Sequence, residues 1–220
     1  MMSEEMNQPE IRMPRIGEKA PQFEAVTTHG PKKLSDYEGK YVVLFSHPAD
    51  FTPVCTTEFV AFQAIYPQLR ELNTELLGLS IDSNQSHLAW VNNIEENFNI
   101  KIEFPVIADL NKNVASQYGM LMPEENSTET SRAVFVIDDK QVIRGIIYYP
   151  LQTGRNMDEI VRLVKALQTT DEHKVSTPAN WEPGDKVIVP PPATQQDIEA
   201  RKNDDSLEVI DWYLSKKSLD

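Results

Sequence analysis

Short apolar segments rich in β-branched residues alternate along this chain with longer segments in which apolar residues recur at helical spacing. Short apolar runs are typical of strands, whereas a period of 3.6 residues is typical of helices. This alternation predicts an α/β protein in which helices cover a central sheet. The expected strands are 41–46, 75–81, 105–108, 133–137 and 142–148, and the expected helices are 53–72, 85–98, 112–118 and 157–168.

The polar residues 138–141 lie directly between two of the expected strands. A connection this short joins antiparallel neighbours, because parallel strands need a crossover of a dozen or more residues. The sheet is therefore expected to be mixed. A strand, a helix and a strand, followed by a hairpin and a last helix, is the order of a thioredoxin-like fold. On the second helix, Trp90 and Phe98 follow the helical spacing and are expected in the core.

The only cysteine of the chain, Cys55, is expected at the start of a helix. Thr52 has the side chain of an N-cap and Pro53 suits the first helical position, so Cys55 falls in the first turn. The unpaired N–H groups and the helix dipole favour an anion there, and the thiol is expected to ionise more readily than that of a free cysteine. The Thr52 oxygen is expected to cap the N–H of Cys55 and to lie close to the sulfur. This pattern predicts a cysteine nucleophile.

A lone cysteine is more often a small buried apolar residue than a nucleophile. Here Pro48, Thr52 and Cys55 follow the pattern Pro, three residues, Thr, two residues, Cys, and this resembles the active-site pattern of the peroxiredoxins. The resemblance is closest to the one-cysteine class and its archaeal and bacterial relatives. It continues through segments 16–17, 80–83, 104–109, 131–135, 148–150 and 189–192.

The resemblance implies a thiol-specific peroxidase that serves in antioxidant defence and needs no cofactor. Such an enzyme reduces hydrogen peroxide and organic hydroperoxides through a sulfenic acid on Cys55. Arg132 matches the arginine that the family sets beside its nucleophile, where a guanidinium suits both the thiolate and the charge that develops on oxygen. His47 matches an active-site histidine of one-cysteine members, with a histidine satisfied by the backbone as the alternative.

Three further residues are expected in the substrate-binding part of the site. Pro48 is expected to stiffen the loop and to shield the sulfur from water. By resemblance, Glu58 and Arg155 match positions around the arginine network, and ordinary surface salt bridges are the alternative for both.

The chain carries a formal charge of −13 at pH 7. This excess of negative charge repels nucleic-acid phosphates and anionic membrane surfaces, so neither is expected as a partner. No apolar stretch reaches the length of a signal-peptide core or a membrane helix, and a cytoplasmic protein is expected. No metal site is expected, because the histidines follow no ligand spacing. They are His29, His47, His87 and His173.

The composition changes near residue 171, where an extended, proline-marked segment begins that is too sparse in apolar residues for a core of its own. We therefore expect a peroxidase domain at 14–170 and a C-terminal arm at 171–220, with a short helix at 194–202 capped by Thr194. The arm either straps its own domain or lies over a second subunit. The resemblance favours a homodimer and leaves open whether such dimers assemble further into a decameric ring.

Without a second cysteine, an oxidised Cys55 has no resolving partner in its own chain. Reduction is therefore expected from an external thiol, either a thioredoxin-like protein or a small molecule. A peroxide sensor or redox-regulated holdase is the alternative function, and peroxide consumption per subunit distinguishes it. A thioredoxin-like reductase needs a second cysteine three residues away, but Thr52 and Glu58 occupy those positions.

Overall fold

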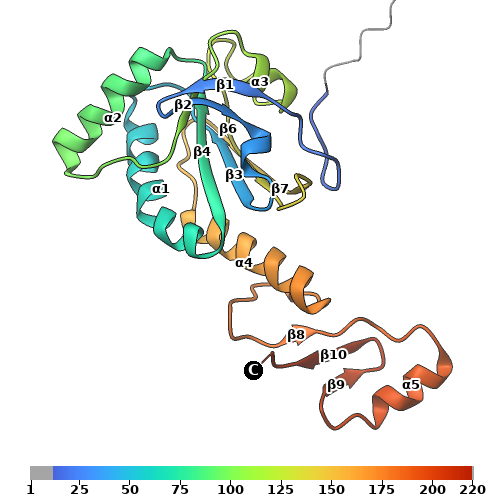
Figure 1. Ribbon diagram of the computed structural model, residues 1–220. Helices are drawn as coiled ribbons and strands as arrows, with labels where there is room; N and C mark the ends of the chain where they lie inside the picture. The colour runs from blue at the N-terminus through green and yellow to red at the C-terminus, as the bar shows by residue number, and fades with distance from the viewer. Residues whose placement is uncertain (1–11, 220) are drawn as a thin grey trace, which may run out of the picture. The chain divides into compact units, whose positions relative to one another are not determined.

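A mixed seven-stranded sheet, in the order β2-β1-β5-β4-β3-β6-β7, forms the centre of the first part of the chain (Figure 1). β3 (Tyr41–Ser46) lies parallel to β4 (Thr74–Ser80), which lies parallel to β5 (Val106–Ala108). β6 (Arg132–Ile137) pairs antiparallel with β3 and with β7 (Ile143–Tyr149). The predicted α/β, thioredoxin-like architecture is confirmed, with its mixed sheet and with the hairpin at 138–141 between β6 and β7.

The computed structural model describes residues 12–219, which divide into two compact units. The first unit ends at Met157 and the second begins at Asp158. The strands and helices expected before Met157 are all present, with ends that differ by at most one residue. The remaining elements of this unit are β1 (Glu24–Thr27), β2 (Gly30–Lys33), the 3-10 helix η1 (Leu34–Tyr37), α1 (Pro53–Glu71), α2 (Asn84–Phe98) and α3 (Asn113–Gln117).

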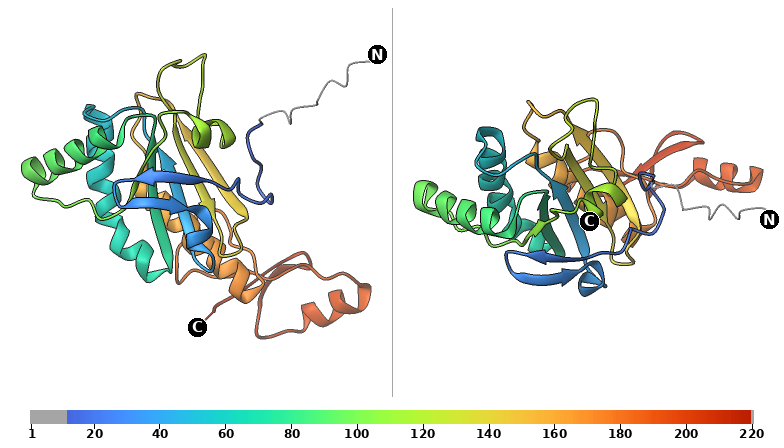
Figure 2. Two further views of the ribbon diagram at one scale, coloured as in Figure 1. Left: turned by 45° about the horizontal axis from the view of Figure 1, so that its top comes forward. Right: turned by 90° about the horizontal axis from the view of Figure 1, so that it is seen from above.

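The two faces of the sheet carry separate sets of apolar side chains. Successive strand residues point to opposite faces, so neighbouring positions on β3 belong to different layers. Leu44 belongs to the buried cluster that includes Val114 of α3, whereas Phe45 packs against Phe59 and Phe62 of α1. Figure 2 shows α1 and α2 over one face and α3 over the other. Both faces of the central strands are therefore buried, which explains their continuous apolar sequence.

An aromatic cluster fills the space between β3 and α1. Phe45 is fully buried and stacks on Phe62 with ring centroids 3.9 Å apart. The rings of Phe59 and Phe104 meet Phe45 edge-on, each at 5.7 Å. Because its rings come from both β3 and α1, this cluster holds the helix against the strand.

Not every sequence expectation holds in the first unit. Trp90 is buried as predicted, but the prediction for Phe98 is wrong, because its side chain is 49% exposed. The buried face of α2 ends one turn earlier, at Ile94. The hairpin of β1 and β2 was not predicted at all, since most of its residues are exposed and show no apolar alternation.

The second unit, which includes most of α4 (Met157–His173) as well as the segment after residue 171, has a small apolar core. Trp181 packs with Ala166, Val175 and Val187, and its indole N–H donates to the Asp185 carbonyl at 3.1 Å. A single large aromatic side chain thus makes a core from few apolar residues. The other elements of this unit are β8 (Val187–Ile188), α5 (Gln195–Lys202), β9 (Glu208–Asp211) and β10 (Leu214–Lys217), with the strands in the order β8-β10-β9.

The short helix predicted at 194–202 is confirmed as α5, together with its cap at Thr194. Thr194 accepts a hydrogen bond from the Asp197 N–H at 3.2 Å. Among residues 12–219, no helix combines the length and apolar character that crossing a membrane requires.

Replacing Phe45 by alanine is expected to lower the free energy of unfolding by about 3 to 5 kcal/mol, because the cavity would lie among rings held by both β3 and α1. Phe98→Ala is the matched control and is expected to change it by less than about 0.5 kcal/mol, since that ring is half exposed. Denaturant unfolding of both variants measures the difference. Equal losses would contradict the assignment of Phe45 to the core.

Candidate active site

The loop at residues 47–52 joins β3 to α1 and presents the cysteine. Thr52 is extended and Pro53 is the first helical residue, so Cys55 lies in the first turn of α1 as the sequence predicts. Cys55 is fully buried. The predicted cap is wrong: the Thr52 hydroxyl donates to the Ala49 carbonyl at 2.8 Å, and no side chain caps α1. The Thr52 side chain therefore bonds to the loop that precedes the helix and not to the first turn of the helix.

Arg132 lies beside the sulfur of Cys55. It is the first residue of β6, and the antiparallel pairing of β6 with β3 brings it next to the end of β3. Its Nη1 donates to the Cys55 Sγ at 3.4 Å, and its Nε donates to the Leu151 carbonyl at 2.8 Å. Arg132 therefore presents a permanently charged donor to the sulfur.

Glu58 binds both arginines that the sequence analysis singled out. Its Oε2 accepts from Arg132 Nη1 at 2.6 Å and from Arg155 Nη2 at 2.7 Å, while Oε1 accepts from Arg155 Nε at 2.8 Å. All three side chains are at most 3% exposed. These residues therefore form a buried network rather than the surface salt bridges considered as the alternative.

Arg155 also contacts backbone carbonyls and aromatic rings. Its Nη1 donates to the carbonyls of Ser46, at 2.8 Å, and Ala133, at 2.9 Å. Its guanidinium carbon also lies 5.2 Å from the centre of the Phe45 ring and 5.1 Å from that of Phe62. Arg155 thus connects β3, β6 and the aromatic cluster to Glu58.

Charge balance in this network controls the ionisation of Glu58. Burial by itself would raise the pKa of Glu58, but the attraction and hydrogen bonds of Arg155, with a further contribution from Arg132, hold that pKa below its ordinary value of 4.5. Glu58 is therefore a carboxylate at neutral pH, as two buried guanidinium groups require.

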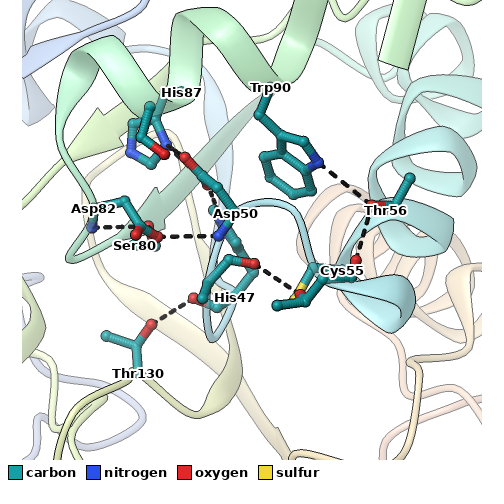
Figure 3. Close-up of polar contacts among 12 residues, drawn as sticks. His47, Asp50, Cys55, Thr56, Ser80, Asp82, His87, Trp90 and Thr130 are labelled. Carbon is teal, nitrogen blue, oxygen red and sulfur yellow. Dashed lines mark hydrogen bonds and ion pairs between the residues drawn. The ribbon is translucent and has the colours of Figure 1, made fainter. Parts of the chain in front are cut away.

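His47 is fully buried at the start of the same loop, and Pro48 beside it is also buried. The His47 Nε2 lies 2.9 Å from Asp50 Oδ1, and the His47 carbonyl accepts from the Thr130 hydroxyl at 2.6 Å. Burial lowers the pKa of His47, against the opposing effect of Asp50, and so favours the neutral ring. Figure 3 shows this network beside the first turn of α1.

The sequence analysis missed the partners of His47. Asp50 and His87 join it in a buried cluster whose candidate ligand atoms lie within 4.8 Å of one another. Two of the four histidines, His47 and His87, therefore lie close together, because the β3–α1 loop meets the first turn of α2 at this point. The indole N–H of Trp90 donates to the Thr56 hydroxyl at 3.3 Å and links α2 to the same turn. Only an Asp three residues after His47 could have signalled this from the sequence.

Comparison with known proteins agrees with the geometry. The AhpC/TSA family matches residues 16–146, and the C-terminal domain of 1-Cys peroxiredoxin matches residues 166–203. The chain is 55% identical to peroxiredoxin 2 of Caldanaerobacter subterraneus subsp. tengcongensis, covering 97% of each chain. It is 56% identical to a peroxiredoxin of Methanocaldococcus jannaschii, covering 94% of this chain and 100% of that one.

Among solved structures, the yeast mitochondrial 1-Cys peroxiredoxin superposes with a TM-score of 0.84 at 41% identity, covering 94% of this chain and 100% of that one. The chain therefore belongs to the peroxiredoxins and is a thiol-dependent peroxidase with a redox-active cysteine. Within the family it is of the one-cysteine class, with its C-terminal extension.

Glu58→Gln is expected to lower the free energy of unfolding by about 3 to 5 kcal/mol at pH 7, because it leaves two buried guanidinium groups without their carboxylate. The folded-state pKa of Glu58 is depressed, so its contribution is complete above the ordinary value of 4.5 and is lost as the pH falls through the folded value. The gap between wild type and variant should therefore close in acid.

Denaturant titrations of both proteins across that range measure the gap. Glu24→Gln serves as the control, since its ion pair with Lys33 is solvent exposed and should leave stability unchanged at every pH. A gap that stays constant into strong acid would show that Glu58 is not the ionised centre of the network.

Proposed function

We propose that this peroxiredoxin reduces hydrogen peroxide and organic hydroperoxides by direct attack of the Cys55 thiolate, and that an external thiol restores the enzyme. The single observation that supports this best is the 3.4 Å contact between Arg132 Nη1 and the Cys55 sulfur. A guanidinium donor and the first turn of a helix both favour negative charge on a sulfur, and on this ground Cys55 is proposed to attack as its thiolate.

The proposed reaction forms one bond and breaks another. The thiolate sulfur bonds to the terminal oxygen of the hydroperoxide, and the O–O bond breaks with its electron pair on the leaving oxygen. The sulfur becomes a sulfenic acid, while the leaving oxygen takes a proton and departs as an alcohol or water. Arg132 is placed to stabilise the charge that moves from the sulfur to the leaving oxygen, since its guanidinium is permanently positive.

The other residues of the site support this step in different ways. Glu58 positions Arg132 by accepting its hydrogen bond, and Arg155 in turn holds Glu58 in place. Thr52 keeps its oxygen lone pairs free while it donates to Ala49, so it can accept a hydrogen bond from a bound peroxide. His47 is assigned a role as hydrogen-bond acceptor, and Pro48 excludes water from the loop.

Regeneration requires a thiol from outside the chain. The sulfenic acid condenses with one external thiol to a mixed disulfide and releases water, and a second thiol then displaces Cys55. The yeast mitochondrial relative is described as resolved by glutathione and thioredoxin systems. A small thiol or a thioredoxin-like protein is the corresponding proposal for this chain.

Cys55→Ser is expected to abolish peroxide consumption, because a serine hydroxyl does not ionise near neutral pH, while the fold is retained. The assay follows peroxide over many turnovers with a panel of reductants that includes glutathione and thioredoxin with its reductase. Circular dichroism confirms folding of the variant. Multiple turnovers by the variant would contradict the mechanism, and wild type that consumes one peroxide per subunit with every reductant would favour a sensor.

We also propose that the C-terminal unit contributes to a homodimer. Three large apolar side chains near its end are exposed, with Ile210 at 55%, Trp212 at 44% and Tyr213 at 55%. Exposed apolar groups that cluster in sequence are typical of a surface that another protein chain covers. Further assembly of such dimers into a ring belongs to the same proposal.

Trp212→Glu is expected to shift the protein from the mass of a dimer toward that of one chain, because a charge would have to be buried in the interface. Size exclusion with light scattering measures the mass. Gln195→Glu adds the same charge on exposed α5 and should leave the mass unchanged. An unaltered dimer in the Trp212 variant would count against this surface.

A further inference from the structure

A cavity of about 340 Å³ lies at the end of β7, where that strand meets the loop before β6. Its wall is formed mainly by the half-buried side chains of Met122, Tyr148 and Tyr149, together with Pro150. Apolar and aromatic groups therefore predominate in the wall. A cavity of this size, lined in this way, suits a small organic group.

The wall of the cavity continues into the surroundings of Arg132. Buried Ser131 belongs to the wall and directly precedes Arg132 in the chain. Tyr149 lies opposite Arg132 in the β6–β7 ladder, so both side chains emerge on the same face of the sheet, with their Cβ atoms about 5 Å apart. Arg132 Nη1 in turn lies 3.4 Å from the Cys55 sulfur. The cavity and the nucleophile are thus linked through one guanidinium side chain.

Hydrogen bonds hold the wall of the cavity in place. The Tyr148 hydroxyl donates to the Gly119 carbonyl at 3.0 Å, which fixes one ring. Glu125 Oε1 accepts the Leu151 N–H at 2.8 Å, and the Leu151 carbonyl accepts from Arg132 Nε at 2.8 Å. The same peptide segment therefore joins the loop, the cavity and the arginine. A preformed cavity costs little ordering entropy when a ligand enters it.

Two carboxylates give the cavity its charge. Within residues 12–219, the charged side chains that line it are those of Glu124 and Glu125, and both are exposed to solvent. They repel a ligand that carries a carboxylate or a phosphate, but they exert no such force on a neutral ligand. A neutral apolar group therefore matches the chemistry of this wall.

We propose that this cavity is a subsite for the organic tail of a hydroperoxide, and that it selects neutral aryl or short alkyl tails over tails that carry a carboxylate. The inference rests on the proposed attack of Cys55 on peroxide. The hydroperoxide group lies against Cys55 and Arg132, and the tail passes Tyr149 into the cavity. When the S–O bond forms and the O–O bond breaks, the tail keeps its own oxygen, which takes a proton, and leaves as a neutral alcohol.

Methyl NMR of the full-length Cys55→Ser protein tests the subsite without turnover. The probe is cumyl alcohol, which is the product left by cumene hydroperoxide. The Met122 methyl signal, identified by its absence in Met122→Leu, is expected to shift as the alcohol is added. The signal of Met157, which does not line the cavity, is the reference. An unmoved Met122 signal would overturn the proposal. So would one that changes on dilution of the protein and not with the alcohol, because a second copy of the chain would then cover the cavity.

Kinetics with two peroxides test the tail directly. Hydrogen peroxide has no tail, so the rate constant for Cys55 oxidation by cumene hydroperoxide, divided by that for hydrogen peroxide, reports on the subsite. Met122→Asp places a charge in the apolar wall and is expected to lower this ratio at least about tenfold, as small changes in apolar pockets do. Leu110→Asp adds the same charge at an exposed residue outside the cavity and should keep the wild-type ratio. An unchanged ratio in the Met122 variant would overturn the proposal.

The charge of the wall has a test of its own. Wild type is expected to react faster with cumene hydroperoxide than with its para-carboxylate derivative, and Glu124→Gln should narrow this preference about two- to threefold at low salt. Glu96→Gln removes an exposed carboxylate outside the cavity and should leave the preference unchanged. The same preference in wild type and in Glu124→Gln would refute the selection by charge.

Failure of the subsite and failure of the proposed function give different results. A wild type that reduces no peroxide with any reductant refutes the proposed function. A wild type that reduces hydrogen peroxide, while the cumene ratio and the Met122 signal stay unchanged, refutes the subsite alone.

Discussion

The structure of the site depends on one buried carboxylate, that of Glu58. It lies one turn after Cys55 and accepts hydrogen bonds from both Arg132 and Arg155. Arg155 in turn binds carbonyls of β3 and β6, so a single network joins a helix and two strands. When Cys55 is a thiolate, two negative groups face two guanidinium groups and the buried charges balance. Oxidation of Cys55 to a neutral sulfenic acid removes one of these four charges.

Sheet topology brings these groups to one place. Because β6 runs antiparallel to β3, its first residue, Arg132, lies beside the loop that leaves the end of β3. Because β4 runs parallel to β3, the segment that leads into α2 begins at the same edge and delivers His87 to Asp50. Two polar networks therefore flank the first turn of α1, one centred on Glu58 and one on Asp50.

Local rules predicted part of this arrangement well. Thr52 and Pro53 placed the helix start correctly, and the polar turn at 138–141 predicted the hairpin. Local rules failed where a side chain had a choice of partners: Thr52 donates to the Ala49 carbonyl instead of capping the helix. The exposed hairpin of β1 and β2 carried no apolar pattern. Composition also gave no sign that Trp181 packs against Ala166 of the preceding helix.

The sequence by itself determined the alternation of strands and helices, the position of Cys55 in a first helical turn and the residues expected around it, because these follow from neighbours a few positions apart. Only the tertiary structure decided that Glu58 binds arginines 74 and 97 residues away and that His87 meets Asp50 across 37 residues. Such contacts depend on strand order and on burial, which removes water as a competing partner and makes each unpaired charge costly.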